Sequence, residues 1–331
     1  MKKFLSITLL LTSVLIAQPE FSGISSMPGA FSRIGFGARG IAMGNSISSV
    51  KTGNLVSFYN PALASFQEGN LFQTAYSFLS LDRTLNFISF TRKFEFGSVE
   101  TPDGKTKPRS VAGFSAGLIN AGVSGIDGRD NQGVKTGDLS TSENQFFIAV
   151  SNRFSDKIAV GIAFKFYLFK LYEDFTSNGV GFDAGILYSY NDALTFSLVM
   201  TDINSKYEWD SGKIYGTSGS ITKNKFPFLT KIGASYHFKE NGILTSIEFE
   251  NSNAGSKYLR AGIEYNIITD LYLRGGIDRI NLVNSEIPLR PSFGFSYFYT
   301  LNNLRLGFDY AFVIEPYSSS DHHIIGVNIN F

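Results

Sequence analysis

Apolar side chains occupy every second position in most of the chain, from about residue 70 to the last residue. The final segment, residues 325–331, alternates isoleucine, valine and phenylalanine with glycine and asparagine. The same period of two recurs in segments 157–168, 257–267 and 303–312. Because successive side chains of a β-strand point to opposite faces, this period predicts strands with one apolar and one polar face.

The segments are long, and their length separates a membrane barrel from a soluble sandwich. Strands of soluble proteins usually have about five or six residues, whereas a tilted strand needs roughly ten to cross the hydrocarbon layer. The polar face is rich in glycine, serine, asparagine and charged residues, and tyrosines gather near segment ends, as at Tyr188 and Tyr297. These features predict an all-β, transmembrane antiparallel β-barrel of about 14 strands. The strands are expected to start near Asn70, Thr84, Ser110, Glu143, Lys157, Asn178, Ala193, Phe226, Gly242, Lys257, Leu271, Leu289, Asn303 and Asp321.

Connections of two lengths alternate between these segments. Tight turns are expected at positions such as 155–156 and 268–270, and long loops over residues 121–142 and 202–225. Barrels of this class have short turns in the periplasm and long loops outside the cell, so both termini are expected to face the periplasm. Residues 95–109 break the alternation, because a long connection stands where a short turn is expected.

The first 17 residues resemble a secretory signal peptide. A basic start at Lys2 and Lys3 precedes an apolar stretch, and Ala17 is a small residue suited to cleavage. The alternative is a buried N-terminal helix or strand. The expected domains are therefore a signal peptide over residues 1–17, an N-terminal plug over residues 18–67 and a transmembrane barrel over residues 68–331.

Composition agrees with a single large β-domain. Among 331 residues there are 32 phenylalanines, 16 tyrosines and 33 glycines but only nine prolines, which suits many strands joined by turns. The chain has no cysteine, which excludes disulfides and lipid attachment at a cysteine. A net charge of +1 gives no reason to expect a nucleic-acid partner.

Residues 18–67 depart from the alternating pattern. A glycine- and alanine-rich stretch runs from Gly37 to Gly44, a short helix is expected over residues 38–50, and an Asn-Pro-Ala motif follows the aromatic Tyr59. The plug motif comprises Gly37, Ala38, Gly44, Asn60, Pro61 and Ala62. Pro61 stiffens a turn there and Asn60 can bond nearby backbone, so the turn is either a latch for the plug or an ordinary helix stop.

These motifs resemble the N-terminal signature of FadL-type outer-membrane barrels. Within that superfamily the chain is most similar to the PorV/PorQ branch, which is associated with type IX secretion. The resemblance covers nearly all of the chain after the signal segment. It implies a 14-stranded barrel whose N-terminal segment folds inside as a hatch.

Chemistry for catalysis or metal binding is not apparent. The only histidines are His237, His322 and His323, and the last two follow Asp321 at the start of a strand. Adjacent strand residues point to opposite faces, so only one of that pair can share a site with Asp321. We therefore expect no enzyme activity, no metal site and no cofactor.

Charged residues lie on the polar face of the strands. They are Lys165, Asp183, Lys231, Glu248, Glu250, Arg260, Glu264, Arg274, Asp278, Arg305 and Asp309. Because both signs occur in similar numbers, we expect a paired network that braces the wall and the plug. The alternatives are a polar gate for a hydrophobic ligand and an ion-selective ladder, which would more often show one sign.

Three functions follow from these expectations. The first is a PorV/PorQ-type component that shuttles secreted cargo at the cell surface, with secretion-system proteins or cargo meeting the two long loops. The second is a FadL-like transporter of small hydrophobic molecules, and the third is an outer-membrane hydrolase. Each implies contact with outer-membrane lipid and with the barrel-assembly machinery. Phe331 is either the assembly signal that this machinery reads or an interfacial aromatic anchor.

Overall fold

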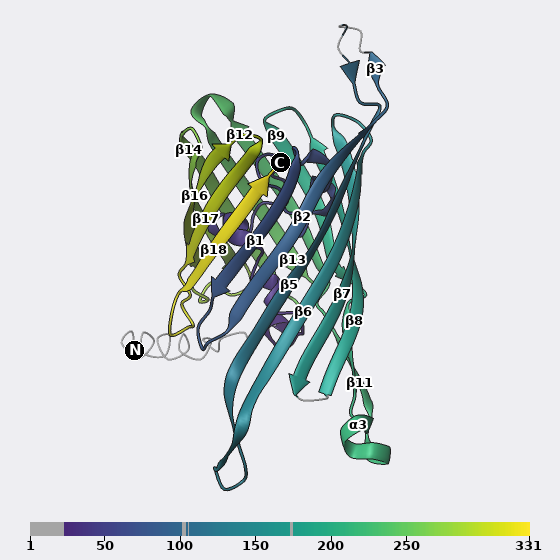
Figure 1. The fold of residues 1–331 in the computed structure, drawn as a ribbon, viewed down its shortest axis with the longest axis vertical. Helices are drawn as coiled ribbons and strands as arrows, with labels where there is room; N and C mark the ends of the chain where they lie inside the picture. The colour runs from purple at the N-terminus through teal and green to yellow at the C-terminus, as the bar shows by residue number, and fades with distance from the viewer. Residues whose placement is uncertain (1–22, 101–103, 105, 173–174) are drawn as a thin grey trace, which may run out of the picture.

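Fourteen antiparallel strands form a closed barrel in the computed structural model, which describes residues 23–331 except 101–103, 105 and 173–174 (Figure 1). The expected fold class is confirmed. Around the ring the order is β8, β7, β6, β5, β2, β1, β18, β17, β16, β15, β14, β13, β12, β9 and back to β8. The bounds are β1 Asn70–Phe78, β2 Thr84–Phe96, β5 Ser110–Arg129, β6 Lys135–Arg153, β7 Ile158–Tyr172, β8 Phe175–Ser189, β9 Leu194–Ile203, β12 Leu229–Phe238, β13 Ile243–Ser252, β14 Lys257–Ile268, β15 Leu271–Asn281, β16 Arg290–Leu301, β17 Leu304–Val313 and β18 His322–Asn330.

The first and last strands of the ring pair with each other. In β1 and β18, Leu71 lies opposite Asn330, and Asn70 and Phe331 exchange two backbone hydrogen bonds of 2.9 and 3.0 Å. The ring also closes between β8 and β9. Closure leaves no edge strand in the ring itself. The backbone N–H and C=O groups of the wall therefore have hydrogen-bond partners in neighbouring strands, as they must where water is absent.

The outer face of the wall is apolar. Ile263 and Phe308 point outward with 46% and 44% of their surface exposed. The residues on either side of each in the chain face the lumen and are small or charged. This distribution is the one expected of a wall surrounded by lipid. Among the helices of the described residues, none is long and apolar enough to cross a membrane.

Long hairpins project from one end of the barrel, which we call the long-hairpin end (Figure 1). Residues 121–142 were expected to be a loop, but β5 and β6 stay paired as far as Arg129 and Lys135. The expectation failed because a ribbon beyond the wall meets water on both faces, so its sequence does not alternate. The other strand starts agree with expectation to within three residues.

The expected loop over residues 202–225 also contains strands. β10 (Lys206–Asp210) and β11 (Ile221–Lys225) form a hairpin whose tip carries α3 (Gly212–Tyr215) and η4 (Gly216–Ser218). β10 pairs with Ser177 and Asn178, near the start of β8. The hairpin thus extends the wall beyond the closed ring. At the opposite, short-turn end, β3 (Val99–Glu100) and β4 (Thr106–Lys107) form the unexpectedly long connection between β2 and β5.

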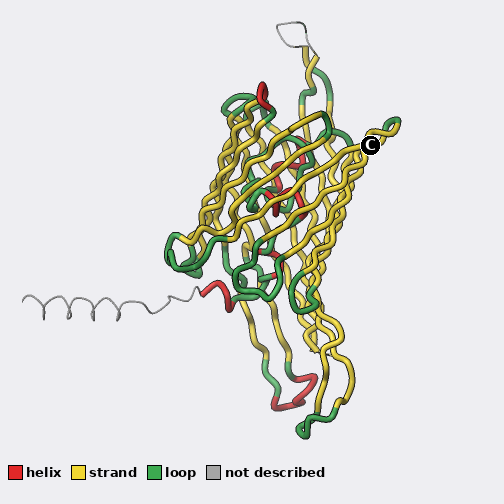
Figure 2. Tube along the Cα trace, turned by 90° about the vertical axis from the view of Figure 1, so that its left-hand side faces the viewer, coloured by secondary structure: helices red, strands yellow, loops and turns green. Residues whose placement is uncertain are grey.

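The segment before β1 fills the barrel (Figure 2). It contains η1 Gly23–Ser26, η2 Phe31–Arg33, α2 Gly37–Ala42 and η3 Pro61–Phe66, and we call residues 23–67 the plug. The expected helix over residues 38–50 is wrong in length, because Gly44 and Asn45 turn the backbone with φ of 60° and 58°. A further single-turn helix, η5 (Lys239–Asn241), connects β12 to β13.

The two described ends of the chain lie at opposite ends of the barrel. Phe331 lies at the short-turn end, as expected. Gly23 instead lies beside Ala254, in the loop between β13 and β14 at the long-hairpin end. The described chain thus enters the lumen at one end and leaves it at the other. The signal peptide and its cleavage site fall outside the described residues.

Candidate functional site at the plug and lumen

Glycines on the lumenal face let the plug approach the wall. A Cβ atom at Gly161 would lie 2.4 Å from the Ala62 nitrogen. A Cβ atom at Gly185 would lie 2.0 Å from Asn60 Oδ1. On the other side of the lumen, a Cβ atom at Gly276 would lie 2.2 Å from the Gly44 nitrogen. Contacts that short do not occur, so the small wall residues are matched to the plug backbone.

The Asn-Pro-Ala motif begins a helix. Asn60 caps η3 by accepting a 3.0 Å hydrogen bond from the Ala62 nitrogen, and Pro61 occupies the first helical position. The interpretation as a helix stop is therefore wrong. The Asn60 amide also donates to the Ser48 carbonyl at 2.9 Å, so this side chain joins two parts of the plug.

The glycine-rich stretch packs around a buried tyrosine. Tyr59 accepts a hydrogen bond from the Phe36 nitrogen at 2.8 Å and donates to Asn45 Oδ1 at 2.6 Å. A Cβ atom at Gly40 would lie 2.3 Å from the Tyr59 hydroxyl oxygen, so only glycine fits there. Gly37 has φ of 76°, which suits a residue without a side chain, and Ala38 is buried.

A first charged network ties the plug to the wall. Arg39 of α2 donates to both carboxylate oxygens of Glu264, at 2.8 and 2.9 Å, and Arg274 binds the same carboxylate at 2.6 Å. Arg274 also contacts Ser296, which in turn donates to Asp309. All these side chains are buried, so each charge depends on its partner.

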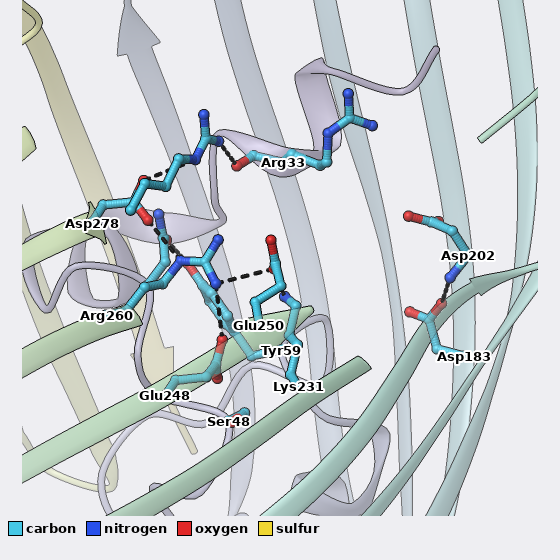
Figure 3. A network of polar contacts seen from close by, with 12 residues as sticks. Arg33, Ser48, Tyr59, Asp183, Asp202, Lys231, Glu248, Glu250, Arg260 and Asp278 are labelled. Atoms are coloured by element: carbon cyan, nitrogen blue, oxygen red, sulfur yellow. Dashed lines mark hydrogen bonds and ion pairs between the residues drawn. The ribbon is translucent and has the colours of Figure 1, made fainter. Parts of the chain in front are cut away.

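A second network surrounds Arg260 on the neighbouring strands (Figure 3). Its guanidinium lies 2.7 Å from Asp278, 3.0 Å from Glu250 and 3.4 Å from Glu248. Lys231 joins the group through Glu250 at 3.6 Å. One cation thus holds three carboxylates from two strands, β13 and β15.

A third network lies where β9 ends. Lys165 is 2.7 Å from Asp183 and 3.1 Å from Asp202. Figure 3 shows the two aspartates, where the Asp202 nitrogen donates to Asp183 at 2.9 Å. The Tyr167 hydroxyl donates to Asp202 at 2.8 Å. Asp202 has φ of 61°, a left-handed conformation that aspartate tolerates better than most residues.

The structure brings ten of the eleven charged candidates into these networks. Arg305 differs, because it lies at the short-turn rim with 38% of its side chain exposed and pairs with Asp270 at 2.7 Å. Sequence reasoning missed Arg39 as a buried charge and placed Asp202 in a loop. The position of Arg39 inside the glycine-rich motif was the available signal. No group of metal ligands occurs among the described residues.

Aromatic side chains line the lumen at the long-hairpin end. Trp209 stacks on Phe175 with ring centroids 4.9 Å apart, and Phe226 lies 4.7 Å from Tyr167 and 4.9 Å from Tyr207. We call this group the outer aromatic cluster; it comprises Tyr167, Phe169, Phe175, Tyr207, Trp209 and Phe226. Sequence reasoning missed it, because two of its members belong to the unexpected strand β10.

A pocket adjoins this cluster between plug and wall. It has about 450 Å³ of empty space, including its open mouth, and its lining includes Phe58, Tyr59, Leu229 and Asp202. Asp202 connects the two features through its hydrogen bond to Tyr167. The enclosed part holds only a few water-sized molecules, so a larger solute needs the plug to shift.

Comparison with known proteins gives structural relatives only. No family model and no curated protein matches the chain. The toluene transporter TodX of Pseudomonas putida is similar with 16% identity and a TM-score of 0.56, over 89% of this chain and 96% of that one. The toluene transporter TbuX of Ralstonia pickettii has 14% identity and a TM-score of 0.56, over 89% and 97%.

A FadL homologue of Pseudomonas aeruginosa matches with 11% identity and a TM-score of 0.54, over 89% of this chain and 98% of that one. The structure thus defines a plugged β-barrel, and its fold is the one found in the two toluene transporters and the FadL homologue. At such low identities the similarity establishes the fold alone.

Proposed function

We propose that this chain is an outer-membrane channel through which small hydrophobic molecules pass. The apolar outer wall, the short turns at one end and the long hairpins at the other support a place in the outer membrane, with the long-hairpin end outside the cell. The expected partners there are the surrounding lipid and the barrel-assembly machinery. The shared fold with two toluene transporters agrees with this proposal.

The outer aromatic cluster is the observation that carries the proposal. Barrel lumens are ordinarily polar, and this one is filled by the plug (Figure 2), which packs against buried apolar residues of the wall and is tied to it by the paired networks. In the outer aromatic cluster, Tyr167, Tyr207, Trp209 and Phe226 are buried and Phe169 and Phe175 are partly buried. The cluster is thus an apolar lining at the outer mouth, which a solute from outside enters by displacing contacts between the rings. The pocket beside Phe58 and Leu229 leads from the cluster toward the plug, and its lining also includes charged residues such as Lys165 and Arg260.

The single tryptophan of the chain provides the test, because Trp209 lies in the cluster. We expect toluene, added to the purified barrel in detergent, to change Trp209 emission saturably. Tyr207→Ala removes a ring from the cluster and should weaken the apparent affinity by about tenfold, the effect of losing part of one buried aromatic contact. Uptake of radiolabelled toluene by cells producing each variant measures passage.

The matched control replaces Tyr236, whose ring lies on the outer wall at 40% exposure. Tyr236→Ala should leave both the titration and the uptake unchanged. A linear, non-saturating change in emission, or equal uptake with and without the protein, would contradict the proposal.

A second candidate is the PorV/PorQ-type role in handling secreted cargo. It is favoured by the projecting hairpins at the long-hairpin end, where Ile214, Tyr215 and Ile221 are 52%, 66% and 64% exposed around the β10–β11 tip. Exposed apolar side chains on a projecting element suit a protein partner. Replacing all three with serine should abolish capture of secretion-system proteins or cargo from native membranes while toluene binding persists.

A further inference from the structure

Two lysines face each other at the base of the β10–β11 hairpin. Lys206 and Lys225 are direct cross-strand partners, so their side chains share one face of the ribbon. Tyr207, the next residue, is 1% exposed and belongs to the outer aromatic cluster. Since adjacent strand residues point to opposite faces, the two lysines lie on the outer side of the wall.

Neither ammonium has a counter-charge among the residues that the structure describes. Among the described residues, no carboxylate lies within 4.0 Å of Lys206 or Lys225, whereas the neighbouring Lys223 is 3.4 Å from Glu208. Like charges directly opposite each other destabilise a strand pair. An anion bound between them would remove this repulsion.

The surroundings place the pair at the border of the apolar wall. Ile203, three residues before Lys206, pairs with Phe182 of β8, whose ring is 46% exposed on the outer face. Val180, also on the outer face of β8, is 39% exposed. The hairpin tip continues away from the barrel, so its base is the part nearest to this apolar surface.

We propose that Lys206 and Lys225 bind the phosphate of a phosphorylated glycolipid in the outer leaflet. Ammonium groups bind phosphate as compact point charges. The acyl chains of the same molecule would lie against Val180, Phe182 and Ile203. The place of the site in the outer leaflet rests on the orientation proposed above, but the site is on the outer wall and does not depend on what passes through the lumen.

Native mass spectrometry of the full chain, released from detergent micelles, tests this site. The probe is a diphosphorylated glucosamine lipid of the lipid A type, compared with its dephosphorylated form and with inorganic phosphate. We expect the protein to retain the phosphorylated lipid in preference to the dephosphorylated one. Each lysine contributes about fivefold in affinity, so K206Q/K225Q should bind roughly 25-fold more weakly.

K239Q is the matched control, because Lys239 lies in the turn at the other end of the barrel. It should bind the lipid as the unmodified protein does, and heat-modifiable migration in gels checks that every variant is folded. Equal retention of the two lipids, or unchanged binding by K206Q/K225Q, overturns the proposal. So does saturation by inorganic phosphate alone, which would indicate a site for the free ion.

Discussion

At the scale of single residues, Glu264 holds two arginines, one from the plug and one from the wall. Glu264→Ala would leave Arg39 and Arg274 buried without that carboxylate. Breaking a buried ion pair in this way costs about 3 to 5 kcal/mol. We expect that loss in the free energy of unfolding, measured by denaturant titration of the refolded barrel.

Glu240 provides the comparison, because it lies in the exposed turn between β12 and β13. Glu240→Ala should change the free energy of unfolding by no more than about 0.5 kcal/mol. If the two variants were equally stable, Glu264 would not brace the plug.

Gly161 tests the fit between plug and wall. Gly161→Ala adds one carbon 2.4 Å from the backbone of Pro61 and Ala62, so the plug must move. Overpacking of this kind costs about 1 to 3 kcal/mol. Gly137→Ala, in the part of β6 where a Cβ meets nothing within 4 Å, is the matched change and should be neutral in the same unfolding assay. Equal effects at the two positions would contradict a close-packed plug.

At the scale of elements, the strands of the wall and the hairpins meet different solvents. Ile263 on β14 and Ile221 on β11 are both exposed, at 46% and 64%. Ile263→Arg should cost about 2 to 4 kcal/mol for a site near the bilayer midplane, because a charge must enter lipid. Ile221→Arg should lower the free energy of unfolding much less, because the hairpin lies in water. Folding into liposomes measures the difference, and equal tolerance would mean that no lipid faces β14.

At the scale of the whole molecule, Phe331 closes the ring against Asn70 and is 53% exposed. We expect its deletion to lower the yield of inserted barrel in cells, while protein refolded in detergent keeps most of its stability. One terminal residue is a small part of a 14-strand ladder. Heat-modifiable gel shifts of both samples measure the effect. Normal insertion in cells would reject the assembly signal, and equal loss in both samples would favour the aromatic anchor.

Part of the candidate site was predictable from the sequence. The phase of each strand placed Arg260, Glu264 and Asp278 on the lumenal face, because the side-chain period of a strand is two. Their partners could not be assigned, since pairing depends on strand register and on where the plug lies. Arg39 shows this, because its carboxylate partner is 225 residues away in sequence.

The sequence by itself determined the number of strands in the ring, nearly all of their starting points and the lumenal side of each. It could do so because a wall between lipid and a polar lumen imposes one alternation on every strand. Tertiary structure alone decided the long β5–β6 ribbon, the β10–β11 hairpin and the outer aromatic cluster. These parts lie beyond the wall or at its mouth, where water or a neighbouring strand replaces lipid and no fixed alternation is required. The path of the plug was likewise decided only in three dimensions, because it depends on which glycines of the closed wall leave room for its backbone.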